Sequence, residues 1–212
     1  MYLSVMDGGL DMVEYIYYMS LNYGGMEVFL ADTTGKVNLL SGSQPQLDGL
    51  KLSENGKKAA YLDTDANTGD TILVEIELGK EKAETVATNV QSFGYIGNTL
   101  IYYFDYTEGV GTLGAAGSKT TIANASGVQF TEDAVYYVAD ADAATGNGEL
   151  RAWDGKTETA IAKDVFAFQY KENGKLVYIG KYDVNAGVGD LYYYDGKEAR
   201  KLDTGITAIF IY

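Results

Sequence analysis

The 212 residues of this chain carry 30 acidic side chains against 16 basic ones, a formal net charge of −14. A surface this negative repels phosphate backbones and anionic lipid, so the composition argues against nucleic-acid binding. Cysteine and histidine are both absent, which excludes disulfides, thiolate nucleophiles, imidazole metal ligands and catalytic triads that use histidine.

The remaining composition favours short strands joined by glycine turns. The chain has 19 Tyr and 26 Gly but a single Pro, and tyrosine is enriched in strands while glycine is enriched in turns. No long segment places apolar residues at helical spacing. No apolar run approaches the roughly 18 residues of a membrane span, so we expect no membrane insertion.

Taken in chain order, the predicted strands fall into five similar repeats. The repeats cover about residues 1–46, 47–90, 91–127, 128–165 and 166–206. Each predicts a first strand, a tyrosine-bearing second strand, an Asp-containing loop, a third strand, a glycine turn and a short fourth strand. The two clearest copies are LSENGKKAAYLDTDANTGDTILVEIELGKEKAETV (52–86) and YKENGKLVYIGKYDVNAGVGDLYYYDGKEARKLDT (170–204).

Two columns of residues mark these repeats along the chain. The glycine of the second turn recurs at Gly35, Gly79, Gly117, Gly155 and Gly196. A tyrosine of the second strand recurs at Tyr17, Tyr61, Tyr102, Tyr136 and Tyr178. Units of about 40 residues with four antiparallel strands are typical of β-propeller blades, which bury their faces against neighbouring blades. The sequence therefore predicts an all-β fold, a single β-propeller domain (1–212) of about five four-stranded antiparallel blades.

The last residues, TAIFIY (207–212), have the pattern of another first strand. We expect this strand to pair with EYIYYMS in the first repeat and to close a five-bladed ring, because closure removes exposed sheet edges. In the alternative, MYLSVM supplies the first strand of the first blade. TAIFIY would then begin a sixth blade of a larger ring.

The five repeats, from about residue 14 to residue 212, resemble a known family, and two segments carry the resemblance most clearly. GDLYYYDGKEARKLDTG (189–205) is similar to the third and fourth strands of TolB-like propellers, and GDTILVEIELGKEKAETV (69–86) is similar more loosely. The resemblance implies a bacterial propeller that serves as a binding platform, a protease-gating domain or a periplasmic scaffold. It does not imply a particular activity, since function is determined by the site and not by the fold.

The loop DTDANTGD (63–70) is the stretch that most suggests a metal. Asp63, Asp65 and Asn67 alternate oxygen-bearing side chains and Asp70 follows, as at the start of an EF-hand calcium loop. The glycine and glutamate that such a loop needs later are missing. Related loops follow the second strand in other repeats: DYTEGVGT (105–112), DADAATGNGE (140–149) and DVNAGVGD (183–190). Because Asp and Gly suit a tight turn without any ion, we expect an Asx-stabilised hairpin and no cofactor, with calcium (Ca2+) as the alternative.

Catalytic carboxylates are a second possibility that the residues allow us to weigh. Propellers that hydrolyse glycosides place Asp and Glu on their innermost strands. Among the expected innermost strands only Asp48 lies near a channel-facing end, and Glu132 and Asp133 fall in a following turn. The tyrosine run 192–194 could stack on sugars, but packing between blades is the favoured explanation for it.

Together these observations predict a non-enzymatic β-propeller module for binding or scaffolding. We expect it to engage a protein or glycan through rim loops or a central channel. The alternatives are a carboxylate-dependent glycoside-acting enzyme and a calcium-stabilised propeller. The start MYLSVMDGG lacks the features of a signal peptide, so the chain is either cytoplasmic or the mature part of an exported protein. We favour an extracellular or cell-envelope location.

Overall fold

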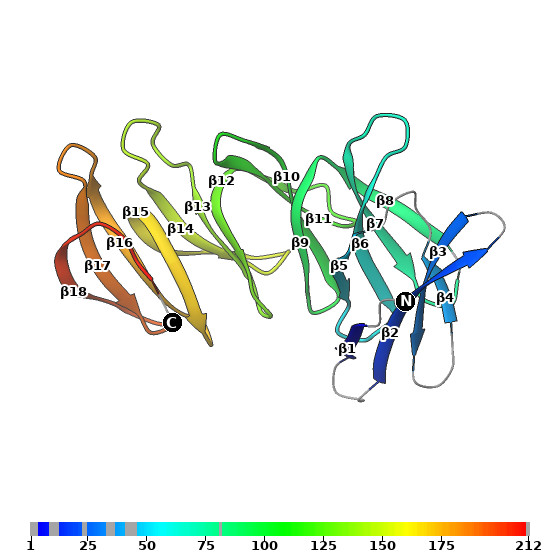
Figure 1. The fold of residues 1–212 in the computed structure, drawn as a ribbon. Helices are drawn as coiled ribbons and strands as arrows, with labels where there is room; N and C mark the ends of the chain where they lie inside the picture. Colours follow the sequence, from blue (N-terminus) through cyan, green and yellow to red (C-terminus); the bar gives the residue numbers. More distant parts are fainter. Residues whose placement is uncertain are drawn as a thin grey trace. The chain divides into compact units, whose positions relative to one another are not determined.

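A computed structural model describes residues 4–8, 13–22, 25–32, 37–40, 46–80 and 82–210 (Figure 1). Side-chain environments are described for 29–31, 49–80 and 83–210. Every regular element within these ranges is a β-strand, and no helix that could cross a membrane occurs among them. The chain divides into two compact units, Met1–Asp105 with Ala115–Ser118, and Tyr106–Gly114 with Lys119–Tyr212.

The first unit contains two antiparallel sheets of four strands and a hairpin. The first sheet has the order β1 (Ser4–Gly8), β2 (Val13–Asn22), β3 (Gly25–Asp32) and β4 (Val37–Leu40). The second has the order β5 (Gln46–Leu52), β6 (Lys58–Thr64), β7 (Thr71–Glu77) and β8 (Lys82–Thr88). The hairpin pairs β9 (Val90–Ile96) with β10 (Thr99–Thr107). Within each sheet and in the hairpin, consecutive strands pair with each other, as the four-strand repeat predicts.

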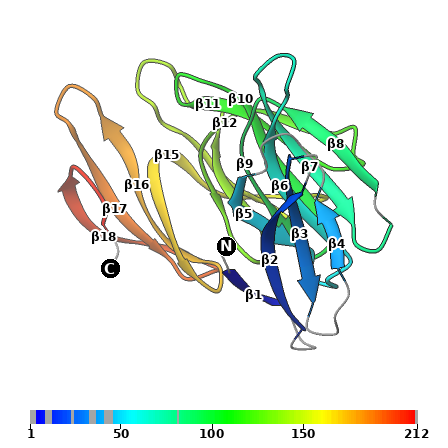
Figure 2. The same ribbon diagram turned by 45° about the vertical axis from the view of Figure 1, so that its right-hand side comes forward.

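The second unit continues the same meander through consecutive strands (Figures 1 and 2). Its strands are β11 (Val110–Ala115), β12 (Thr121–Phe130), β13 (Val135–Ala139), β14 (Gly148–Trp153), β15 (Glu158–Glu172), β16 (Lys175–Asp183), β17 (Val188–Tyr194) and β18 (Ala199–Ile206). Each pairs antiparallel with the next.

Two long strands each serve two neighbouring four-strand groups. The first part of β15 pairs with β14, up to Val165 opposite Gly148, and its second part pairs with β16, from Val165 opposite Gly180. β12 is divided in the same way between β11 and β13. The fourth strand of one repeat and the first strand of the next are therefore one continuous strand, where the sequence predicted two.

Residues in the left-handed region mark these changes of partner. Asn124 in β12 and Asp164 in β15 both have a φ of 55°, and so does Asn89 between β8 and β9. Asn and Asp tolerate this region better than other residues with a Cβ. The Asn124 amide also donates to the Asp140 carboxylate (3.3 Å), and the Asn89 amide donates to Asp105 (3.3 Å). A short polar side chain thus fixes the bend at the crossing.

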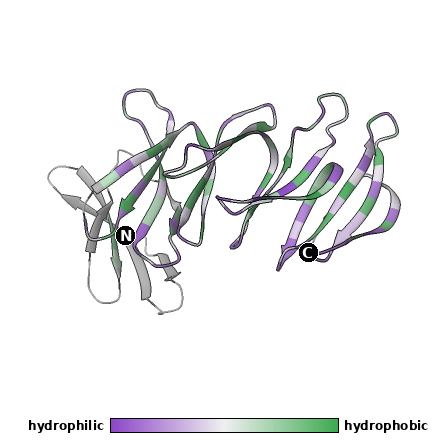
Figure 3. Ribbon diagram, turned by 180° about the vertical axis from the view of Figure 1, so that it is seen from behind, coloured by the Kyte–Doolittle hydropathy of each residue, from purple (hydrophilic) through white to green (hydrophobic). Residues whose placement is uncertain are grey.

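The core of the first unit lies on both faces of the β5–β8 sheet. Tyr61, which is fully buried, packs with Ala59, Val74 and Leu50 on one face. Ala60 and Leu73 point to the other face, where they meet Val90, Phe93 and Leu100 of the hairpin. Figure 3 shows the matching succession of apolar and polar segments along single strands. A sheet buried on both faces gains stability from each neighbouring layer.

The core of the second unit corrects one column of the predicted repeat. Tyr136 of β13 packs in one cluster with Phe168 and Tyr178 of the following four-strand group. The Tyr136 side chain therefore packs against the following four-strand group, whereas the Tyr178 side chain packs against the preceding one. The two tyrosines cannot occupy equivalent positions in their repeats. Because side chains alternate along a strand, the counterpart of Tyr178 is Tyr137, which is fully buried on the opposite face.

Two glycines are needed because neighbouring strands approach closely, and not because of turn geometry. Gly148 begins β14 without a positive φ. A Cβ at this position would lie 2.4 Å from the Ala139 carbonyl oxygen, and at Gly189 of β17 it would lie 2.5 Å from Cγ2 of Ile179. Both glycines follow the second-to-third-strand loop and let the two strands approach.

The structure does not form the expected closing strand over residues 207–210, which are irregular. Residues 211 and 212 lie outside the described residues, as does Gly35 of the turn column. The side chain of Tyr17 lies outside them too. Five blades and a closed ring are therefore not confirmed. The all-β character and the antiparallel pairing of consecutive strands within each sheet are confirmed.

Candidate functional site in a groove between two hairpin turns

Asp65 in the 63–70 loop forms an Asx turn. Its Oδ1 accepts hydrogen bonds from the backbone N–H groups of Asn67 (2.8 Å) and Thr68 (3.1 Å). The N–H of Gly69 donates to the Asp65 carbonyl (2.8 Å). These backbone donors, Asn67 first and then Thr68, lower the pKa of the Asp65 carboxyl. Oδ1 of Asp65 therefore already serves the turn without any ion.

The other candidate ligands of this loop do not gather around Asp65. Asp63 is 2% exposed and its Oδ1 accepts the N–H of Thr64 (2.8 Å), whereas Asp70 is exposed. Within the described ranges no three acidic side chains are placed to hold a metal ion. The hydrogen bonds are those expected of an Asx-stabilised hairpin.

The same turn recurs in later repeats, with a different alignment from the predicted one. Asp142 and Asp183 each accept the N–H groups two and three residues onward. Asp65, Asp142 and Asp183 are therefore equivalent. Asp183 does not correspond to Asp63 and Asp140, although the sequence pattern aligned it with them.

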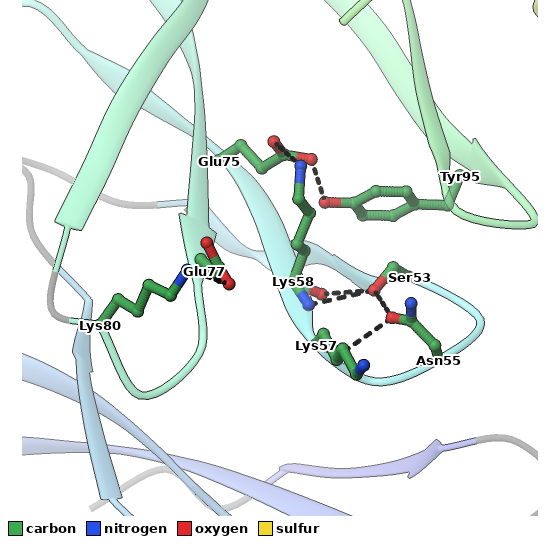
Figure 4. A network of polar contacts seen from close by, with 8 residues as sticks. All are labelled: Ser53, Asn55, Lys57, Lys58, Glu75, Glu77, Lys80 and Tyr95. Atoms are coloured by element: carbon green, nitrogen blue, oxygen red, sulfur yellow. Dashed lines mark hydrogen bonds and ion pairs between the residues drawn. The ribbon is translucent and has the colours of Figure 1, made fainter.

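Two carboxylate networks stabilise the layers, one in each unit. Glu75 accepts hydrogen bonds from Lys58 Nζ (2.8 Å) and from Tyr95 Oη (2.8 Å), which links the β5–β8 sheet to β9 (Figure 4). Burial, together with the hydrogen bond to Glu75, raises the pKa of Tyr95 well above its usual range. Tyr95 thus remains a protonated donor at neutral pH and is unsuited to act as a base.

The network in the second unit surrounds Arg151 of β14. Its guanidinium contacts the carboxylates of Glu149 and Glu158, and Tyr137 Oη donates to Glu158. Burial and the hydrogen bond to Glu158 raise the pKa of Tyr137 above its usual range. These carboxylates are occupied by a cation and a phenol, so neither network offers an acid and a base facing an open space.

The remaining candidates from the sequence are the tyrosine run and three acidic residues. The ring of Tyr192 stacks on Tyr178, with 4.9 Å between centroids, and Arg200 lies over Tyr193 at 5.3 Å. Tyr192 and Tyr193 are half-buried, and each makes a packing contact through its ring. The side chain of Asp48 lies outside the described residues. Glu132 and Asp133, in contrast, lie at a groove.

This groove has a volume of about 310 Å³ and lies between two hairpin turns of the second unit. One wall is residues 130–133, from the end of β12 into the turn before β13, and the other is residues 170–173, from the end of β15 into the turn before β16. Half-buried Phe130 and Tyr170 supply the apolar lining. Glu132, Asp133 and Glu172 are exposed, and the one cation among the lining residues is Lys171, which is also exposed.

Gln129 holds the two walls together. Its Nε2 donates to the carbonyl of Phe168 (3.0 Å), and its Oε1 accepts the N–H of Tyr170 (3.0 Å). One amide therefore satisfies both groups of a neighbouring backbone. The ring of Tyr170 is further placed by Tyr136, with 5.0 Å between centroids. The groove is thus bounded by a fixed wall before any ligand binds.

The sequence predicts Glu132 and Asp133 as acidic turn residues, but it does not predict the groove. The two walls are about 40 residues apart in sequence, one repeat length. The signal was present, since an aromatic residue directly precedes an acidic turn in two consecutive repeats, in QFTED and QYKEN.

Comparison with known proteins places the fold. No protein-family profile matches the sequence, and no curated protein matches it. Among solved structures, the β-propeller domain of the trilobed protease from Pyrococcus furiosus, described as having an open velcro topology, matches with a TM-score of 0.52 and 14% identity. That match covers 95% of this chain and 72% of that one. Acylaminoacyl peptidase from Pyrococcus horikoshii matches with a TM-score of 0.51 and 13% identity over 95% of this chain and 39% of that one.

The fold is propeller-like. At these identities the similarity extends to architecture alone, and this chain spans only about two fifths of the length of the peptidase. TolB from Acinetobacter baumannii matches with a TM-score of 0.42 and 13% identity, over 90% of this chain and 52% of that one. That score is too low to carry an argument, so the TolB-like family stays a prediction.

Proposed function

We propose that this chain is a non-catalytic propeller-like module that binds a protein or glycan ligand at its rim. The groove between the turns at 130–133 and 170–173 carries the proposal. Its volume lies within the usual range of ligand sites, and its lining combines two aromatic side chains with polar and charged groups from both walls. The groove lies on turns, where binding residues are often found in rigid β-scaffolds.

The described side chains favour binding over catalysis. A glycoside hydrolase of either stereochemical type needs two carboxyl groups in an acid and a base or nucleophile role. Glu75, Glu149 and Glu158, the carboxylates of the two networks, are all engaged by Lys58 or Arg151. The carboxylates of the groove are exposed to solvent, whereas the acid of a glycoside hydrolase ordinarily lies in a shielded environment.

The proposal is tested by screening the purified chain against arrays of short peptides and of oligosaccharides. Hits are then mapped by NMR on backbone amides. We expect shifts concentrated in residues 130–133 and 170–173. A ligand that shifts only amides elsewhere would overturn the groove as the site, and turnover of a glycoside would overturn the non-catalytic role.

A further inference from the structure

We infer that the groove takes a cationic side chain, arginine or lysine, from an extended peptide of a partner protein. This inference rests on the proposed binding function and specifies its ligand. Its three parts are the charge balance of the groove, the aromatic lining and the unengaged state of the acidic groups.

The charge balance of the groove favours a cationic ligand. Glu132, Asp133 and Glu172 contribute three negative charges against the single positive charge of Lys171. A cation entering between the two turns would meet carboxylates from both walls at once. Such charges also steer an oppositely charged partner during encounter, and the net charge of −14 adds to that field.

The acidic groups of the groove are not used by the fold. Several carboxylates elsewhere in the second unit are engaged: Asp142 and Asp195 accept turn N–H groups, and Asp190 pairs with Lys201 at 2.8 Å. Glu132, Asp133 and Glu172 form no ion pair and no side-chain hydrogen bond within the described ranges. The fold therefore leaves three carboxylates of this one groove available to a ligand.

The aromatic lining favours an organic cation over a metal ion. Phe130 and Tyr170 lie on opposite walls, and the electron-rich face of an aromatic ring attracts guanidinium and ammonium groups. The apolar stem of arginine or lysine can pack along such rings while its charged end meets the carboxylates. A hard cation would need oxygen ligands converging on one point, and the described residues contain no such cluster.

The test measures binding of three capped tripeptides to the full chain by NMR titration at low salt. The peptides are acetyl-Gly-Arg-Gly-amide, the same peptide with neutral citrulline in place of arginine, and the same peptide with glutamate. Maltotriose serves as the glycan probe. The variant E132Q with E172Q removes two groove charges. The control E108Q with E198Q removes two exposed charges outside the groove, so both variants carry the same net charge.

We expect the arginine peptide alone to bind, with shifts at residues 130–133 and 170–173. Binding should weaken about fivefold in the groove variant and stay unchanged in the control. It should also weaken as salt is added. Equal binding of the citrulline peptide, or equal weakening in both variants, overturns the inference while leaving a binding module. Maltotriose binding at the groove does the same and favours a glycan. If none of the four probes binds, the inference is wrong, and the array screen decides the proposed function separately.

Discussion

Replacing Gln129 with alanine removes the amide that joins the two walls of the groove. The side chain makes two hydrogen bonds of 3.0 Å, to the Phe168 carbonyl and the Tyr170 N–H. A typical hydrogen bond contributes about 0.5–1.5 kcal/mol net. Two such bonds therefore predict a loss of about 1–3 kcal/mol in the free energy of unfolding, larger if water cannot reach the two backbone groups.

The chain offers both a probe and a control for this prediction. Trp153 is the only tryptophan, is 3% exposed and lies in the second unit, so its fluorescence during urea unfolding reports on that unit. Gln169 lies on β15, next to both partners of Gln129, but its side chain is exposed. We expect Q169A to change stability by less than about 0.5 kcal/mol. If Q129A and Q169A unfold at the same urea concentration, the amide bridge does not join the walls as argued.

Four further predictions follow from individual contacts. G148A should cost about 3 kcal/mol, because its Cβ would meet a backbone oxygen at 2.4 Å, whereas G109A should cost about 1 kcal/mol, since only its φ of 92° is strained. Urea unfolding that ranks them in the opposite order would contradict the close-approach argument. N147A should lower stability by about 1–2 kcal/mol in the same assay, since this amide bonds both backbone groups of Tyr182 (2.9 and 3.2 Å); an unchanged midpoint would refute it. The N–H and hydroxyl of Thr145 lower the pKa of Asp142. The turn should therefore stabilise the fold at pH above the unfolded-state pKa of about 3.9, and this contribution should be lost as the pH falls through the lower folded-state pKa. NMR titration of the carboxyl group measures the folded-state pKa, and a value above about 3.9 would contradict the prediction. Neither calcium at about 1 mM nor a chelator should change the melting temperature, because only a ligand that binds the native state raises it and we expect no calcium to bind. A rise with calcium would support a metal site at 63–70.

The sequence predicted the strand content and the four-strand repeat because both depend on local patterns. Alternating apolar residues and glycine turns repeat about every 40 residues. The sequence pattern misaligned equivalent residues of the repeats by one or two positions where residues of the same type lie close together. Tyr136 and Tyr137 are adjacent tyrosines, and only packing against Phe168 shows which of them faces forward. Asp183 resembled Asp63 by sequence, but its hydrogen bonds match those of Asp65.

The candidate site could not be predicted as a site for a different reason. Glu132 and Asp133 were visible as acidic turn residues, but their partners on the opposite wall come from the next repeat. Gln129 gave no signal, since a glutamine in a strand is ordinarily a solvent-facing residue. Its role depends on the distance between two strands that are not neighbours in the chain.

The continuous strand β15 has a consequence for how the second unit comes apart. Its amides before Val165 are protected by pairing with β14, and those after it by pairing with β16. Neither group can open fully without fraying a strand that the other also uses. Strand sharing therefore couples neighbours in the manner of a one-dimensional chain of interacting repeats. Amides on both halves of β15 should exchange with solvent at a common rate, as parts of one cooperative element.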